Sequence, residues 1–166
     1  LIGGIDPARE YVLRALRAGR HVVTANKQLV AQHGEELFET ARENGVQLRF
    51  EAAVAGVVPV IRVIQESLAA TEITKVFGIV NGTTNFMLSA MSEGQSYAEA
   101  LAEAQRLGYA EADPTDDVGG RDAAAKMAIL ATVAFGSRVP LEWVCVQGID
   151  ALREEHGFER WAVLGH

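Results

Sequence analysis

The sequence predicts an α/β fold with a parallel sheet. In residues 1–52, segments with a helical apolar period alternate with short strand-like runs, and only a few residues connect them. This order of helix, strand, helix and strand is typical of parallel sheets covered by helices. The apolar pattern changes near residue 50, so we expect two domains, residues 1–50 and residues 51–166.

The chain is expected to begin with a helix followed by a strand. Asp6-Pro7 is an N-cap residue followed by proline, which is a preferred way to start a helix. This helix ends at Gly19, and residues 21–25 (HVVTA) form a short β-branched strand.

A second helix and a second strand complete the first domain. The helix follows residues 26–27, is interrupted around residues 33–34 and resumes until Gly45. Residues 46–52 (VQLRFEA) alternate between apolar and polar side chains, as a strand with one buried face does.

The second domain is expected to open with a helix and a strand. Residues 54–69 have an apolar period of 3.6 with Pro59 near their start, which predicts a well-buried helix. Residues 72–80 (EITKVFGIV) are predicted as a strand, and residues 81–85 (NGTTN) as a polar loop that opens the next helix.

A capping box marks a further helix in this domain. Ser96 and Glu99 are spaced as a capping box for the helix 96–107, which ends on Gly108. Residues 142–148 are a last strand candidate.

Composition excludes several classes of protein. The net charge of −7 argues against nucleic acid and anionic membranes as partners. A single cysteine, Cys145, excludes an internal disulfide, and its apolar surroundings predict a core position. No apolar run is long enough for a membrane span and no secretory leader is present, so we expect a cytoplasmic protein. The ends are abrupt, which suggests a piece of a longer polypeptide.

The chemistry is concentrated in residues 108–130. Four carboxylates fall within seven residues, and a helix follows with an acid and an amine four residues apart; these residues are Glu111, Asp113, Asp116, Asp117, Asp122 and Lys126. Crowded carboxylates repel one another unless a cation lies among them. That cation is either Lys126 or the ammonium group of a bound small molecule.

Each part of this region also has a structural interpretation. Acids with proline are ordinary turn formers, and an acid and a lysine at i and i+4 are a common surface pair. However, Lys126 is followed by the apolar run MAILATVAF, so its helix is expected to be buried on most sides. An amine in such surroundings can exchange protons near neutral pH.

Five motifs in order resemble homoserine dehydrogenase: TANK (24–27), EAAVAG (51–56), NGTTN (81–85), GYAEADPTDD (108–117) and GGRDAAAK (119–126). The resemblance covers residues 1–150. It implies the second half of a Rossmann-type nucleotide-binding domain, followed by an α+β catalytic and dimerisation domain with a mixed sheet. It also implies reduction of aspartate 4-semialdehyde to homoserine with NADH or NADPH, on the route to threonine, methionine and isoleucine.

The resemblance assigns roles to individual residues. Lys126 matches the proton donor, and Asp122 the acid beside it. The substrate-binding matches are Glu111 and Asp117 for the α-ammonium, Gly82 and Thr83 for the carboxylate, and Lys27 and Tyr109 as further contacts. Asp113 and Asp116 are expected to be turn and N-cap residues. The cofactor-binding matches are Gly3, Gly4 and Lys27, and a sodium site matches Glu51, Val54, Gly56 and Val58.

Two departures and two alternatives remain. The phosphate-binding pattern G-x-G-x-x-G is not found in this sequence, so at most the second half of the nucleotide-binding domain is expected. Glu51 is equally readily a structural acid bonded to backbone. The chain is alternatively a non-catalytic amino-acid-binding module or a cation-binding acidic loop. Lys126 argues against the binding module, since a pocket for an ammonium gains nothing from a second cation.

Overall fold

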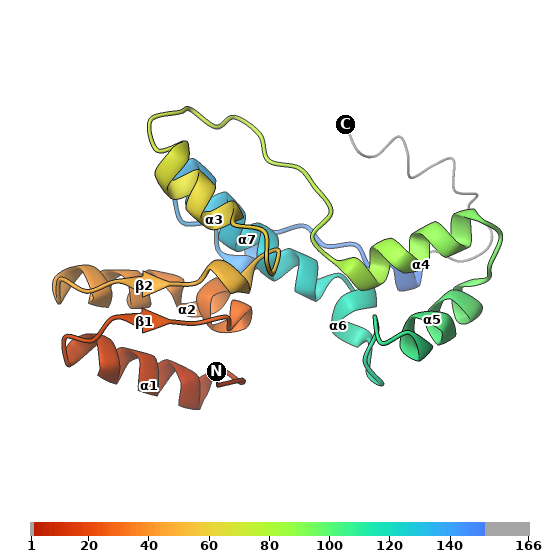
Figure 1. The fold of residues 1–166 in the computed structure, drawn as a ribbon, viewed down its shortest axis with the longest axis horizontal. Coiled ribbons are helices and arrows are strands. Elements are labelled where there is room, and N and C mark those ends of the chain that lie inside the picture. Colours follow the sequence, from red (N-terminus) through yellow and green to blue (C-terminus); the bar gives the residue numbers. More distant parts are fainter. Residues whose placement is uncertain (1, 152–166) are drawn as a thin grey trace. The chain divides into compact units, whose positions relative to one another are not determined.

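The computed structural model describes residues 2–151 of the chain (Figure 1). The chain divides into two compact units, one of Leu1–Val80 with Ala124–Val144 and the other of Asn81–Ala123 with Cys145–His166. The division follows from how the segments pack into compact units. The predicted domain boundary near residue 50 stays a prediction. No helix within residues 2–151 has both the length and the apolar character needed to cross a membrane.

The first unit contains the predicted parallel α/β arrangement. Its elements begin with α1 (Asp6–Arg17), β1 (Val22–Val23), α2 (Lys27–Glu43) and β2 (Leu48–Arg49). The two strands are parallel, with Val22 opposite Leu48 and Val23 opposite Arg49. Helix α1 packs on β1 and on α2, and α2 packs on β2 (Figure 1). The small sheet therefore confirms the predicted order, although both strands are shorter than expected.

Helix α1 starts one residue earlier than predicted. Asp6 is its first residue, and the N-cap position is held by Ile5, which makes no side-chain cap. Asp6 lies instead in the first turn, where a carboxylate is favourable beside the positive end of the helix dipole.

The predicted interruption of α2 is wrong, because Gly34 lies inside one continuous helix. Gly34 is buried, and a Cβ atom there would lie 3.2 Å from Cε2 of Phe38. The glycine therefore provides room for the Phe38 ring, whose centroid lies 5.2 Å from that of Phe50 in a tilted arrangement. Packing against Phe38 therefore explains why a glycine lies inside this helix.

The well-buried helix predicted over residues 54–69 is wrong in length and in burial. The structure has a 3₁₀ turn η1 (Glu51–Ala53), then α3 (Val60–Arg62), which continues as the π-helical turn η2 (Val63–Ser67). Within these two helical turns only Ile61 and Ile64 are buried. The loop before Pro59 has exposed valines and lies outside the helix, because proline favours the first turn over the interior.

Helix α7 (Arg121–Phe135) completes the core of the first unit. Ile129 and Leu130 of α7 pack into one cluster with the buried faces of α1, α2 and α3. Other members of this cluster are Leu16, Leu29, Leu37, Phe50, Val54 and Ile61.

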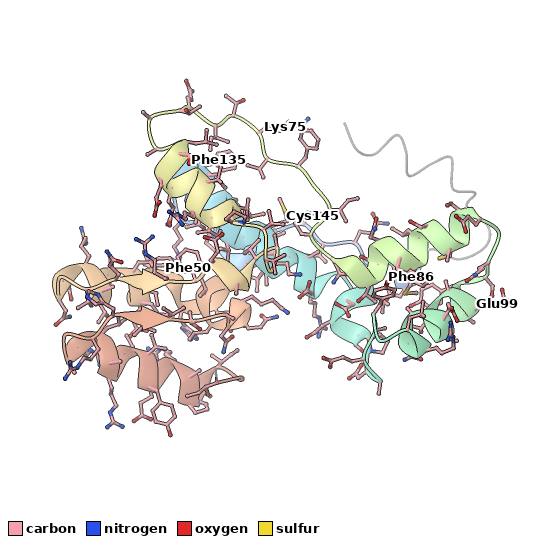
Figure 2. All side chains as sticks on the ribbon, in the orientation of Figure 1. Phe50, Lys75, Phe86, Glu99, Phe135 and Cys145 are labelled. Atoms are coloured by element: carbon pink, nitrogen blue, oxygen red, sulfur yellow. The ribbon has the colours of Figure 1, made fainter. Side chains whose placement is uncertain are left out.

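Both strands predicted for the second domain are absent from the structure. Residues 72–80 and 144–148 pair with no strand among residues 2–151, and Leu141–Trp143 form the 3₁₀ turn η3. A β-like pattern becomes a strand only when a partner satisfies its backbone groups. Cys145 is exposed, so its predicted core position is also wrong (Figure 2). The mixed sheet stays a prediction.

The second unit is helical and contains α4 (Gly82–Ser92), α5 (Tyr97–Arg106), α6 (Thr115–Val118) and the 3₁₀ turn η4 (Ile149–Ala151). Helix α4 packs on α5 and on α6 (Figure 1). Their shared core consists of Met87, Ala90, Ala100, Ala104, Ala110 and Val118.

The predicted capping box of α5 is confirmed. The Glu99 amide donates to Oγ of Ser96 at 3.3 Å, and the Ser96 amide donates to Oε2 of Glu99 at 2.8 Å. Hydrogen bonds from the hydroxyl and then the amide of Ser96 lower the pKa of Glu99. The chain leaves the helix through Gly108, whose φ of +78° favours glycine.

Glu51 caps α3. Its Oε1 accepts from the Ile61 amide at 2.9 Å, and its Oε2 accepts from the Arg62 amide at 2.9 Å. These amides lie in the first turn of α3, so they have no carbonyl partner within the helix. The structure therefore shows Glu51 as a structural acid bonded to backbone amides, which is the alternative given in the sequence analysis.

We expect Glu51→Ala to lower the free energy of unfolding by about 1–2 kcal/mol, the usual cost of losing a helix cap. Chemical denaturation measures this, with the exposed Glu72→Ala as control. The loss should be equal in sodium and potassium chloride. A loss seen in sodium alone would assign the carboxylate to the ion instead.

Candidate active site

The candidate site is built around Asn81, the residue that precedes α4. Asn81 is its N-cap: Oδ1 accepts from the Thr84 amide at 2.8 Å and from the Thr84 hydroxyl at 2.9 Å. Asparagine before a helix is a common cap, because its oxygen satisfies an amide of the first turn. Asn81 is 6% exposed, so the cap is buried.

The other end of the same amide joins two acids that are distant in sequence. Nδ2 of Asn81 donates to Oδ1 of Asp117 at 2.7 Å and to Oδ2 of Asp122 at 2.9 Å. Asp117 lies on α6, and Asp122 lies in the first turn of α7. Both acids were predicted as site residues, whereas Asn81 was not. Its sequence signals were its place before a helix and its place in the motif NGTTN (81–85).

Thr83 extends this cluster. Its hydroxyl donates to the Tyr109 carbonyl at 2.5 Å and lies 3.2 Å from Oδ2 of Asp117. Thr83 is 6% exposed. A hydroxyl has one proton, so this one is already used within the protein. The free donors at this end of α4 are the backbone amides of its first turn, which include Gly82 and Thr83.

Lys126 lies one turn after Asp122 on α7. It is half-buried, and its Nζ donates to the Val80 carbonyl at 2.7 Å. Around it the helix buries Ala124, Ala125 and Ile129, as the apolar pattern predicted. The carbonyl bond holds the amine at a fixed position within the first unit.

The loop between α5 and α6 presents the remaining predicted acids. Glu111 is exposed, and its carboxylate makes no hydrogen bond or ion pair with residues 2–151. Its carbonyl accepts from Nε2 of Gln105 at 3.2 Å, which ties the loop to α5. The ring of Tyr109 is exposed and lies 5.0 Å from that of Phe86 (Figure 2). The structure thus leaves both Glu111 and Tyr109 accessible.

Asp113 forms a turn, as the sequence predicts, whereas the N-cap prediction for Asp116 is wrong, because Pro114 holds the N-cap position of α6. Oδ1 of Asp113 accepts from the hydroxyl and the amide of Thr115, and these bonds lower the pKa of Asp113. Asp116 is exposed in the first turn of α6 and lies 3.9 Å from Arg121.

The predicted cofactor residues meet at the N-terminus of α2. Lys27 is the first residue of that helix, and Asn26 is its N-cap. Nδ2 of Asn26 donates to the Gly4 carbonyl at 2.7 Å, which ties the Gly3-Gly4 loop to the residue before Lys27. Gly4 has a φ of +74°, a conformation that favours glycine. A helix N-terminus beside a flexible glycine loop and a lysine fits an anionic cofactor.

The predicted sodium residues lie on one tight loop of the first unit. Ala55 and Gly56 both have positive φ, which turns the chain sharply between Val54 and Val58. Both carboxylate oxygens of Glu51 already accept amides of α3, and the Val58 carbonyl accepts from the Val60 amide at 2.8 Å. No group of three metal-binding side chains occurs within residues 2–151. Sodium there stays a prediction from the resemblance.

An open cavity of about 380 Å³ lies elsewhere in the first unit. It is lined by α2 and the end of α7, including Phe38, Thr132 and Arg138. It contains none of the predicted site residues.

Comparison with known families gives two matches. A family model described as homoserine dehydrogenase matches residues 59–165, and one described as homoserine dehydrogenase, NAD binding domain, matches residues 2–51.

Individual relatives agree with these matches. The chain is 53% identical to the homoserine dehydrogenase of Bacillus subtilis over 93% of its own length, and 59% identical to that of Corynebacterium glutamicum over 90%. It covers 36% and 34% of those proteins, about a third of their length.

Solved structures give the same result. A homoserine dehydrogenase from Thiobacillus denitrificans is 50% identical with a TM-score of 0.90, over 99% of this chain and 38% of that one. A hyperthermophilic archaeal homoserine dehydrogenase in complex with NADPH is 35% identical with a TM-score of 0.81, over 91% of this chain and 47% of that one.

Proposed function

The chain belongs to the homoserine dehydrogenase family, and from this premise we propose that the whole protein interconverts aspartate 4-semialdehyde and homoserine with NADH or NADPH. The observation that carries the proposal is the pair of acids on Asn81, Asp117 and Asp122, with Lys126 one turn further along α7. An acidic pair suits a substrate with an ammonium group, and a lysine supplies the proton that carbonyl reduction requires.

Lys126 is the proposed proton donor. When bound, the nicotinamide supplies the hydride, and its arrival at the aldehyde carbon turns the carbonyl oxygen into an alkoxide. An ammonium near that oxygen neutralises the alkoxide as it forms, and the neutral amine takes the proton back in the reverse reaction. The bond from Nζ to the Val80 carbonyl supports this role, because it fixes the position of the amine before the substrate arrives.

The acids are the proposed site for the substrate's α-ammonium. This site consists of Asp117, which is half-buried, and Glu111, the accessible carboxylate on the neighbouring loop. The buried Asp122 is proposed as the acid beside Lys126, which orients the amine or holds a water. The substrate's carboxylate is assigned to the N-terminus of α4, where the amides of Gly82 and Thr83 combine with the positive end of the helix dipole. Tyr109 is assigned to the rim of this site, because its ring is exposed.

The cofactor is assigned to the N-terminus of α2, with Lys27, Gly3 and Gly4 as its contacts in this chain. The tie from Asn26 to the Gly4 carbonyl supports the assignment. The family resemblance further leads us to propose a cytoplasmic homodimer whose catalytic domain contains a mixed sheet. The exposed Phe77 and Ile79 on the extended segment 72–80 support an apolar interface there.

We expect Lys126→Ala in the whole protein to reduce kcat by about 10²–10⁴-fold, the usual contribution of a positioned acid. The dissociation constant for homoserine should change far less, because the lysine acts mainly in the transition state. Steady-state kinetics and calorimetry measure the two quantities, with Lys75→Ala as the control on an exposed lysine. Comparable losses in both quantities would remove Lys126 from proton transfer.

We expect Glu111→Gln to raise the dissociation constant for homoserine by about tenfold or more, because the ammonium loses a charged partner. Calorimetry measures this directly. Glu93→Gln, at the exposed C-cap of α4, is the matched control. Unchanged binding in Glu111→Gln would place the ammonium elsewhere.

A further inference from the structure

The side-chain amide of Asn81 uses all its hydrogen-bonding groups, the oxygen with donors of Thr84 and the nitrogen with two acids. Its oxygen accepts two donors from Thr84, at 2.8 and 2.9 Å, and its nitrogen donates to Asp117 at 2.7 Å and to Asp122 at 2.9 Å. An amide can donate two protons and accept two, so all its bonds are used here.

This network also fixes which way the amide faces. Turning it around would place the oxygen against two carboxylates and the NH₂ group against two donors from Thr84. Both contacts would be repulsive, so the hydrogen-bond network selects one orientation. Both carboxylates therefore bond to a nitrogen whose orientation the network determines.

The amide joins the carboxylates without cancelling their charge. Both carboxylates lie within 3 Å of one nitrogen, and in such proximity they repel each other unless donors or cations offset the repulsion. A lysine or arginine at position 81 would provide donors but would also neutralise one negative charge. A neutral donor instead adds no charge of its own to the pair.

The charged groups around Asn81 come from two helices. Among residues 2–151, Asp117 of α6 and Asp122 of α7 bond directly to Asn81, and α4 adds the threonine hydroxyls. Lys126 holds the carbonyl of Val80, the residue before Asn81. Asp116 and Arg121 form an exposed pair on the solvent side.

We propose that Asn81 is a positioning residue of the active site, a neutral bridge that holds Asp117, the proposed partner of the substrate's ammonium group, in a fixed position relative to Asp122, the acid beside the proposed proton donor. The proposal deepens the proposed function and rests on it. Asn81 itself acts through the two carboxylates.

The test uses Asn81→Asp and Asn81→Ser in the whole protein. Aspartate and serine are both good N-cap residues, so both variants keep an acceptor for Thr84. Aspartate replaces the bridging donor by a third carboxylate, whereas serine removes the donor and adds no charge. Asn44→Asp is the matched control, because Asn44 also donates from Nδ2, to the Thr40 carbonyl at 2.8 Å, with no acid involved.

We expect Asn81→Asp to lower kcat/KM for homoserine by about 10- to 100-fold, the usual effect of losing buried bonds to charged groups. The acidic limb of its pH profile should move to higher pH, because repulsion from the added carboxylate opposes ionisation. Asn81→Ser should show a smaller loss without this shift. The affinity for NADPH should be unchanged in both, and Asn44→Asp should match the wild type.

A wild-type kcat/KM and pH profile in Asn81→Asp would overturn the proposal, whatever its melting temperature, because Asn81 would then be a helix cap only. An equal change in Asn44→Asp would overturn it as well, since the effect would then come from added charge in general.

Unfolding experiments separate this proposal from the proposed function. If the wild-type protein fails to oxidise homoserine, the proposed function fails, and the bridge is still testable by denaturation. The third carboxylate adds repulsion to the native cluster when it is ionised, so Asn81→Asp should lose stability relative to wild type as the pH rises from about 4 to 7. A stability difference from wild type that is as small as that of Asn44→Asp, and that does not change with pH, would overturn the proposed bridge.

Discussion

The site depends on the hydrogen bonds between one side-chain amide and two carboxylates. Asn81 joins α4 to Asp117 on α6 and to Asp122 at the start of α7, residues that lie 36 and 41 positions away. Each partner alone would be an ordinary cap or surface acid. Together they place negative charge at a helix N-terminus, where backbone amides provide the opposite polarity within the same unit. An amino acid has the complementary groups, an ammonium for the acids and a carboxylate for the amides.

A second asparagine has the same construction in the other unit. Asn26 caps α2 through the Leu29 amide at 3.0 Å and donates from Nδ2 to the Gly4 carbonyl. In both places the oxygen caps a helix while the nitrogen ties a distant segment to its N-terminus. Candidate binding residues follow directly in the chain, Lys27 after Asn26 and Gly82 after Asn81. In each case one residue therefore caps the helix and lies beside the candidate binding residues.

Local signals in the sequence predicted local structure well. The capping box of α5 and the parallel pair of strands formed where their patterns lay, because short-range bonds determine the box and adjacent helices cover the strands. Predictions failed where the outcome depended on distant partners. Gly34 proved to be a packing contact for Phe38, and residues 72–80 found no strand to pair with among the described residues. Asn81 was missed for the same reason: its capping oxygen has a sequence signature, and its bridging nitrogen has none.

Calorimetric titration of the whole protein with homoserine and with 4-hydroxybutyrate tests the central claim most directly. The two compounds differ only in the α-ammonium group, which the acids around Asn81 are proposed to bind. The account predicts that 4-hydroxybutyrate binds at least about tenfold more weakly, the cost of leaving the acidic pair without its cation. Equal affinity for the two compounds would contradict it.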